Sequence, residues 1–219
     1  MVEKNIDENI LVFCAHSDDQ IFGPGGALAK YAKEGKKIYT YIFTYGELTH
    51  PHFKRQVIIK IRVKESQKAD AEIKGEGVSF FGLSETKFLE ESKEKGIHEK
   101  IRDIIKEKTP TKIFTHNADD PHADHRAVNK IVLDAIEEVK SNADVYAFDV
   151  WSPLSLAYRK NPKLVVDISK TFKIKLKALR HFESQKLAMI MLLWSVYAKA
   201  IKNGIFNGYR YAEVFYKIR

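Results

Sequence analysis

The chain has 219 residues, of which 44% are hydrophobic and 30% charged, and this length and composition suit one compact domain with a sizeable core. The formal net charge of +8 raises the question of an anionic partner such as nucleic acid. Its lysines are scattered and interleaved with glutamate, as in KEKGIHEKIRDIIKEK (93–108), which is typical of a solvated helix face. We therefore expect no nucleic-acid partner.

The chain contains one cysteine, Cys14, so an internal disulfide is excluded and a cytoplasmic location is expected. Cys14 lies in an apolar run and is interpreted as a small buried hydrophobe. The first residues, MVEKNIDEN, lack the apolar segment of a signal peptide. The longest apolar run, at 187–198, is shorter than the roughly 20 residues of a membrane span, so no span is expected.

Short branched and aromatic runs alternate with segments of helical periodicity along most of the chain. Strands are predicted at 10–15, 37–43, 78–81, 112–116, 144–150, 164–169 and 211–218. Helices are predicted at 21–35, 54–74, 97–108, 123–141, 170–185 and 186–203. This alternation predicts an α/β fold, a Rossmann-like three-layer sandwich with a mostly parallel central sheet, in a single domain over 1–219. Ligands of such sheets bind beyond the carboxyl ends of the strands.

A first polar cluster, HSDDQ (16–20), follows the first predicted strand. One reading is a turn in which an aspartate caps the next helix, but one aspartate suffices for that. Adjacent Asp18 and Asp19 repel each other unless a cation offsets their charge, and His16 stands beside them. The cluster alone leaves the turn and a metal site open.

A second cluster, DDPHADH (119–125), follows the fourth predicted strand. The proline and the acidic residues fit the start of a helix. His122 and His125 do not fit that explanation, and their spacing of three puts both on one helix face. Zinc hydrolases use three histidine or carboxylate ligands, leaving a further carboxylate as general base and a further histidine for the oxyanion. Spacing alone does not assign these roles.

Both clusters resemble the signatures of one family. AHSDDQ (15–20) resembles the AHPDDE motif, and PHADHRAV (121–128) the HPDHxxV motif, of the PIG-L (LmbE-like) zinc-dependent N-deacetylases. Weaker similarities follow in the expected order, at FTYGE (43–47), RVKES (62–66), VDIS (166–169), KALRHFESQ (177–185) and YAEVF (211–215). The resemblance spans nearly the whole chain and implies the family's fold.

The resemblance also implies a role for each matching residue. One zinc ion per chain would be held by His16, Asp19 and His125, and Asp18 would be the general base that takes the proton of the attacking water. His122 would support the oxyanion or protonate the leaving amine, with Asp124 orienting it. The implied reaction hydrolyses the acetamide of an N-acetylglucosamine-containing small molecule to the free amine and acetate. The alternatives are a zinc amidase on a non-sugar or thiol conjugate, and a catalytically weakened metal-binding homologue.

Glu47 and Arg62 match segments that resemble substrate-contacting parts of the family, so both are expected to bind substrate. The alternative for Arg62 is a helix-surface arginine paired with a carboxylate. Gln20 replaces the family's glutamate beside the metal ligands, where a neutral amide would make the site less negative.

Three other features of the sequence each allow more than one interpretation. His50 and His52 lie in a loop that either rims the site or is simply solvated. His116 either supports the second cluster or is a satisfied near-core histidine. The apolar segment 187–201 is expected to combine core packing with an oligomer contact, rather than to lie on a membrane surface.

Overall fold

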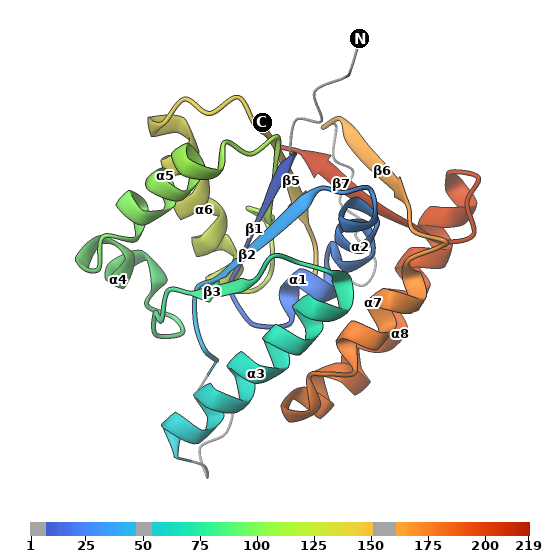
Figure 1. Ribbon diagram of the computed structural model, residues 1–219, viewed down its shortest axis with the longest axis horizontal. Helices are drawn as coiled ribbons and strands as arrows, with labels where there is room; N and C mark the ends of the chain where they lie inside the picture. Colours follow the sequence, from blue (N-terminus) through green and yellow to red (C-terminus); the bar gives the residue numbers. More distant parts are fainter. Residues whose placement is uncertain (1–7, 47–53, 151–160) are drawn as a thin grey trace.

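The computed structural model describes residues 8–46, 54–150 and 161–219, and their strands form one seven-stranded sheet (Figure 1). The spatial order is β3-β2-β1-β4-β5-β7-β6. The strands are β1 (Asn9–Cys14), β2 (Lys37–Ile42), β3 (Val78–Phe80), β4 (Lys112–His116), β5 (Asp144–Phe148), β6 (Lys163–Asp167) and β7 (Ala212–Lys217). Each matches a predicted strand within a few residues.

The first five strands run parallel, and only β7 pairs antiparallel, with β5 on one side and β6 on the other. The predicted mostly parallel sheet is therefore confirmed. The chain moves outward from β1 through β2 to β3, and then returns to place β4 on the other side of β1. The carboxyl ends of β1 and β4 thus flank the point where the strand order reverses, which is where open α/β sheets bind ligands.

Helices cover both faces of the sheet and complete the predicted three layers (Figure 1). On one face lie α4 (Phe88–Glu94), α5 (Ile97–Lys108) and α6 (Ala123–Glu138). On the other face lie α1 (Asp19–Phe22), α2 (Gly25–Lys33), α3 (Arg55–Ile73), α7 (Phe172–Leu179) and α8 (Lys186–Phe206), with the 3-10 helix η2 (Glu183–Gln185) between the last two.

The central strand β1 shows why two helical layers form. Its side chains alternate between the faces, as in any strand, but both sets are apolar. Ile10, Val12 and Cys14 enter the core under α2 and α7, whereas Leu11 and Phe13 enter the core under α5 and α6. All five are fully buried, so Cys14 is the small core residue that was expected.

Three helix predictions differ from the structure. The helix predicted at 21–35 is divided into α1 and α2, because Gly23 and Pro24 form a corner between them. A side chain at Gly23 would stand 2.4 Å from the Phe148 ring, so the chain needs a glycine there. Helix α4 was not predicted, and the helix predicted at 170–185 ends at Leu179.

A buried ion pair fastens this corner to the sheet. Lys175 Nζ of α7 lies 2.6 Å from Glu213 Oε1 of β7 and also donates to the carbonyls of Phe22 and Gly23. The Glu213 carboxylate accepts the main-chain N–H groups of Gly26 and Ala27, at the N-terminus of α2. These bonds hold α1, which begins within the first polar cluster, against β7.

Within the described ranges we find no helix with the length and hydrophobicity that crossing a membrane requires.

Candidate metal-centred active site

The two predicted clusters meet at the carboxyl edge of the sheet. The first follows β1, where Asp18 O accepts the N–H groups of Ile21 and Phe22 as the chain turns into α1. The second follows β4 and opens α6, with His122 as the residue that precedes the helix. Because β1 and β4 are neighbours in the sheet, the fold brings together side chains separated by about one hundred positions.

Of the three residues expected to bind zinc, both histidines lie close to one oxygen of the third, Asp19. Asp19 Oδ2 lies 3.3 Å from His16 Nδ1 and 3.4 Å from His125 Nε2. One ligand atom from each residue falls within 4.8 Å of the others, so the three atoms can surround one cation. His125 Nε2 is buried and has no hydrogen-bond partner in the described structure, which fits a nitrogen lone pair directed at a metal ion.

Electrostatics fit the same interpretation. Burial acts to lower the pKa values of His16 and His125. Hydrogen bonds to Asp124 and Asp19 nevertheless raise the pKa of His16 to about 10, and the charge of Asp19 raises the pKa of His125 to about 9. Burial opposes ionisation of Asp19, but the charge of His125 keeps the pKa of Asp19 well below its usual range. Without a cation, the three side chains therefore form an ion cluster, and binding a metal would release protons.

Asp120 orients His125 from behind and was not predicted as a site residue. Its Oδ1 lies 3.0 Å from His125 Nδ1, as an ion pair, and accepts the main-chain N–H of His122. A carboxylate at Nδ1 favours the tautomer with the proton there, which leaves Nε2 free to bind a metal. The acidic run before Pro121 was the available signal, but it was explained by the helix start alone.

His116, at the end of β4, packs its ring flat against His125. The ring centroids are 3.8 Å apart and the planes differ by 14°. His116 Nε2 accepts the main-chain N–H of Ala15, at 3.0 Å, so the neutral ring carries its proton on Nδ1. Burial and the charge of His125 lower the pKa of His116 to about 4. Its lone pair is used by the main chain, so His116 supports the cluster and is a poor candidate for a ligand.

His122 faces the cluster in a different tautomer from His125. Its Nδ1 accepts the main-chain N–H of Asp124, at 3.2 Å, so the neutral ring carries its proton on Nε2. Burial and the charges of His16 and His125 lower the pKa of His122, which keeps it neutral. His122 thus has an N–H to donate, which suits an oxyanion-stabilising residue better than a ligand.

Asp124 was expected to orient His122 with its carboxylate, but the main chain does this. The Asp124 carboxylate instead accepts the N–H of Thr86 at Oδ1, 2.9 Å away, and places Oδ2 3.6 Å from His16 Nε2. Thr86 has a left-handed backbone, with φ at 67°, which is strained for a β-branched residue. The loop before α4 therefore helps to position the His16 side of the cluster.

Asp18 lies beside the cluster and lines a cavity of about 240 Å³. Burial and the neighbouring charge of Asp19 raise the pKa of Asp18 to about 6, and Arg62 and His16 oppose the shift. A carboxylate with such a pKa ionises close to neutrality and can accept a proton there. The cavity is also lined by Arg62, Glu85, Thr86, His122, Gln185 and Leu192.

Arg62 is not a surface residue, so that alternative is wrong. It is 1% exposed and lines the cavity. Its guanidinium donates to Ser17 Oγ and to the carbonyl of Gly46, at 3.3 and 3.2 Å. Three residues further along α3, Glu65 accepts the N–H and hydroxyl of Ser184 in the middle of η2. The last residue of η2, Gln185, lies in the cavity wall. Glu47, His50 and His52 lie outside the described residues.

Gln20 stabilises the turn of the first polar cluster from its core side. Its amide donates to the Ser17 carbonyl, at 3.1 Å, and its oxygen accepts the Cys14 thiol, at 3.8 Å. Gln20 is 1% exposed and contacts the core side of the turn. A carboxylate at this position cannot donate to the Ser17 carbonyl unless it is protonated.

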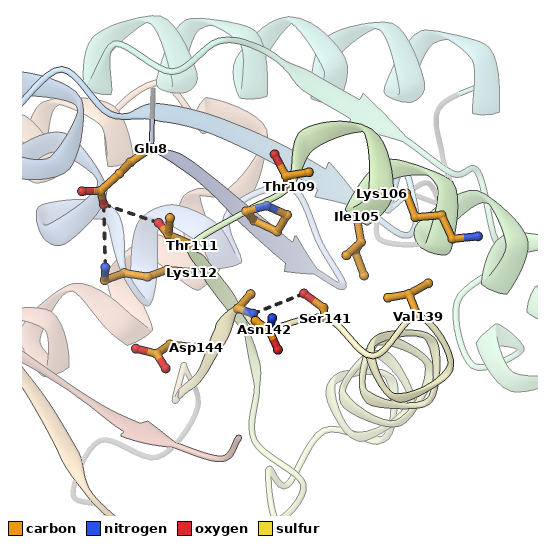
Figure 2. Close-up of a pocket in the computed structure, with 12 residues that line it drawn as sticks. Glu8, Ile105, Lys106, Thr109, Thr111, Lys112, Val139, Ser141, Asn142 and Asp144 are labelled. Carbon is orange, nitrogen blue, oxygen red and sulfur yellow. Dashed lines mark hydrogen bonds and ion pairs between the residues drawn. The ribbon is translucent and has the colours of Figure 1, made fainter. Parts of the chain in front are cut away.

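A larger cavity, of about 640 Å³, lies at the opposite edge of the sheet (Figure 2). It is formed by the amino ends of β4 and β5 and the carboxyl ends of α5 and α6. Its charged side chains are Glu8, Lys106, Lys112 and Asp144. The groups of metal-binding side chains found in the described ranges all lie at the other edge.

Comparison with known proteins identifies the family. The model of the PIG-L family, described as GlcNAc-PI de-N-acetylase, matches residues 11–136. This chain belongs to the PIG-L family. The match begins in β1 and ends in α6, so it contains both polar clusters. The family is hydrolytic, and the chain is accordingly a hydrolase of the PIG-L type.

Three relatives show the range of chemistry on this PIG-L fold. A probable N-acetyl-α-D-glucosaminyl L-malate deacetylase of Bacillus cereus is 27% identical, over 84% of this chain and 87% of its own. A 4-oxalmesaconate hydratase of Pseudomonas putida is 24% identical, over 90% and 80%. The structure of N,N'-diacetylchitobiose deacetylase from Pyrococcus horikoshii superposes with a TM-score of 0.78 at 20% identity, covering 95% of this chain and 82% of the other.

Proposed function

We propose that this protein is a zinc-dependent N-deacetylase that converts an N-acetylglucosamine-containing small molecule to its free amine and acetate. One observation supports it above the others. His16, Asp19 and His125 converge within ligand distance of one another, and Asp18 stands beside them in a cavity. This arrangement provides three ligands and a separate base, which is the division of labour that metal-assisted amide hydrolysis needs.

The proposed ligands are His16, Asp19 and His125, each of which is oriented by a neighbour. Asp120 stands behind His125, Asp124 stands beside His16, and the main-chain N–H of His16 donates to Asp19 Oδ2 at 2.8 Å. A zinc ion held there supplies a Lewis acid for the amide carbonyl and lowers the pKa of water to about 7.

Asp18 and His122 carry the proton chemistry in this proposal. Asp18 takes a proton from the attacking water, for which its raised pKa is suited. The His122 Nε2–H donates to the carbonyl oxygen as negative charge develops on it. The amine then leaves with the proton that Asp18 took from the water, and acetate is the second product.

The cavity supports a small N-acylated group as the substrate. Its volume of about 240 Å³ suits one sugar ring rather than an extended chain. Arg62 lies in its wall with Asp18, although two of its contacts are to the main chain and to Ser17, so we propose that it binds substrate as well as holding the turn. Glu47 remains proposed as a substrate contact, and the relatives named for acetylated glucosamine compounds support this substrate class.

The test is acetate release from N-acetylglucosamine conjugates by the zinc-loaded protein. We expect turnover in the wild type and a loss of about 10²–10⁴-fold in Asp18→Asn, the range that removal of a general base gives. Metal content, measured by mass spectrometry, is expected to be unchanged in this variant. Asp144→Asn, at the opposite edge of the sheet, is the matched control and should retain full activity. The proposal is wrong if Asp18→Asn keeps its turnover or if no such conjugate is cleaved.

A second candidate is hydration of a carbon–carbon double bond, since one relative is named as a hydratase. The same base and metal site would activate water, but no acetate would be released. Incubation with unsaturated dicarboxylates and detection of the hydrated product separates the two. A zinc amidase on a non-sugar or thiol conjugate would release a carboxylate from those substrates only. A weakened homologue would bind zinc without turnover.

We also propose that residues 1–219 form a single domain, that the protein is cytoplasmic, and that its metal is zinc rather than another divalent ion.

A further inference from the structure

Helix α8 exposes a continuous apolar stripe along its length. The stripe consists of Leu187, Ile190, Trp194, Tyr197, Ile201 and Ile205, which are between 40% and 75% exposed. The opposite side of the helix, with Leu192, Val196 and Ala200, is buried against the core. The core therefore accounts for one side of α8 and leaves the stripe unexplained.

The spacing of the α8 stripe indicates the kind of surface that covers it. Successive members from Leu187 to Ile201 are separated by three, four, three and four residues. This 3.5-residue period makes a narrow straight seam, which is the pattern of a helix that packs lengthwise against another helix. Among the described residues, the core occupies the opposite side of α8 and leaves this stripe exposed, so a helix of a second molecule is the partner that the pattern favours.

The amount of exposed apolar surface is that of a protein interface. With the exposed neighbours Met191, Leu193 and Phe206, the α8 stripe presents on the order of 1,000 Å². The largest apolar patch on an ordinary monomer is about 300–600 Å². Each partner in a standard stable complex buries about 800 Å². The patch also includes Met191, Trp194 and Tyr197, three residue types that are enriched in interface centres.

We propose that the α8 stripe is the interface between two copies of this chain, with the two α8 helices packed along each other. A two-fold axis needs a self-complementary surface, and a uniform apolar seam meets that need without matched charges. Within the described part of α8, the exposed side chains between Leu187 and Ile201 are all apolar, and exposed lysines stand only beyond the ends, at Lys186 and Lys202. A membrane-surface helix instead carries basic residues along its length.

The test measures the mass of the full chain by size-exclusion chromatography with light scattering at micromolar concentrations. We expect the wild type at twice its 25.2 kDa chain mass, or at a larger even multiple. Ile190→Lys and Trp194→Lys are expected to halve the mass, because each buries a charge in the seam. Leu89→Lys is the matched control, since Leu89 is 46% exposed on α4, far from the stripe in sequence, and it should leave the mass unchanged.

A cross-linking experiment keeps the proposal falsifiable if a lysine variant fails to fold. Tyr197→Cys lies near the middle of the α8 stripe and should form a covalent dimer with a short bis-maleimide, whereas Leu89→Cys should not. Native Cys14 is buried and will not react. A single-chain mass for the wild type would overturn the proposal. So would co-sedimentation of the wild type, but not of Ile190→Lys, with phosphatidylcholine or phosphatidylglycerol vesicles. Neither result depends on the proposed enzymatic function.

Discussion

The two edges of the sheet hold cavities that differ in size and chemistry. The cavity at the amino edge is about 640 Å³, and the cavity at the carboxyl edge is about 240 Å³. At the amino edge, charged groups have partners close to solvent. Lys36 lowers the pKa of Glu8, and Lys217 lowers the pKa of Asp144. These are ordinary surface ion pairs.

At the carboxyl edge, burial acts on almost every titratable group. It raises the pKa of Asp18 to about 6 and lowers that of His116 to about 4. Several carboxylates and imidazoles are held close together there, and the main chain sets the tautomers of His116 and His122. Groups forced together in this way have perturbed ionisation, which is typical of catalytic sites. The larger cavity thus lies away from the candidate site, so cavity volume alone does not point to that site, whereas its buried ionisable groups do.

The largest expected effect comes from removing a ligand at the carboxyl edge. His125→Ala should lose zinc binding and deacetylation together, by about 10³-fold or more, because the Lewis acid contributes several kcal/mol. Isothermal titration with zinc and the acetate assay measure the two losses. Lys112→Ala at the amino edge is the control. If His125→Ala binds zinc like the wild type, the proposed ligand set is wrong.

The next largest effect is on the free energy of unfolding. It is expected to differ between a buried ion pair near the carboxyl edge of the sheet and an exposed ion pair at the amino edge. Glu213→Gln should lower the free energy of unfolding by about 3–5 kcal/mol, because it leaves Lys175 buried without its counter-ion. Lys217→Met, which removes the partner of the half-exposed Asp144, should cost less than about 1 kcal/mol. Urea unfolding followed by circular dichroism measures both. Equal losses in the two variants would contradict the role assigned to burial.

A smaller effect is expected at His116. His116→Phe keeps a flat ring against His125 but removes the acceptor of the Ala15 N–H. We expect zinc affinity to fall about 10–100-fold, as is usual when a residue behind a ligand is changed. Competition with a chromophoric chelator measures it. His181→Ala, a partly exposed histidine on the loop after α7, should leave affinity unchanged. An unchanged affinity in His116→Phe would make His116 a packing residue only.

The smallest expected effect is the pH dependence. Below its pKa, Asp18 is protonated and cannot accept a proton, so kcat/KM should fall about tenfold per pH unit on the acid side. Burial places that limb near pH 6, and a bound cation, which favours the carboxylate, moves it lower. A pH–rate profile of the zinc-loaded enzyme measures the limb. A limb lying well above pH 6 would contradict Asp18 as the base.

The sequence by itself determined most of the architecture and the residues of the two clusters. Buried parallel strands such as β1 read as continuous apolar runs, and a histidine with adjacent aspartates after a strand has no structural role that needs all of them. The break between α1 and α2 was missed, because it depends on the Phe148 ring of a distant strand.

Only the tertiary structure decided how the residues of the site act. Asp120 and His116 became part of the site because β4 lies beside β1, and His122 and His125 differ in tautomer because different atoms face their rings. Only the structure showed that Gln20, which makes the site less negative than a glutamate would, also holds the turn from the core side. Similarly, the periodicity of α8 predicted an apolar helix but not which side the core would cover. The physical reason is that tautomers, burial and partners depend on atoms that are distant in sequence, whereas strand and helix patterns are local.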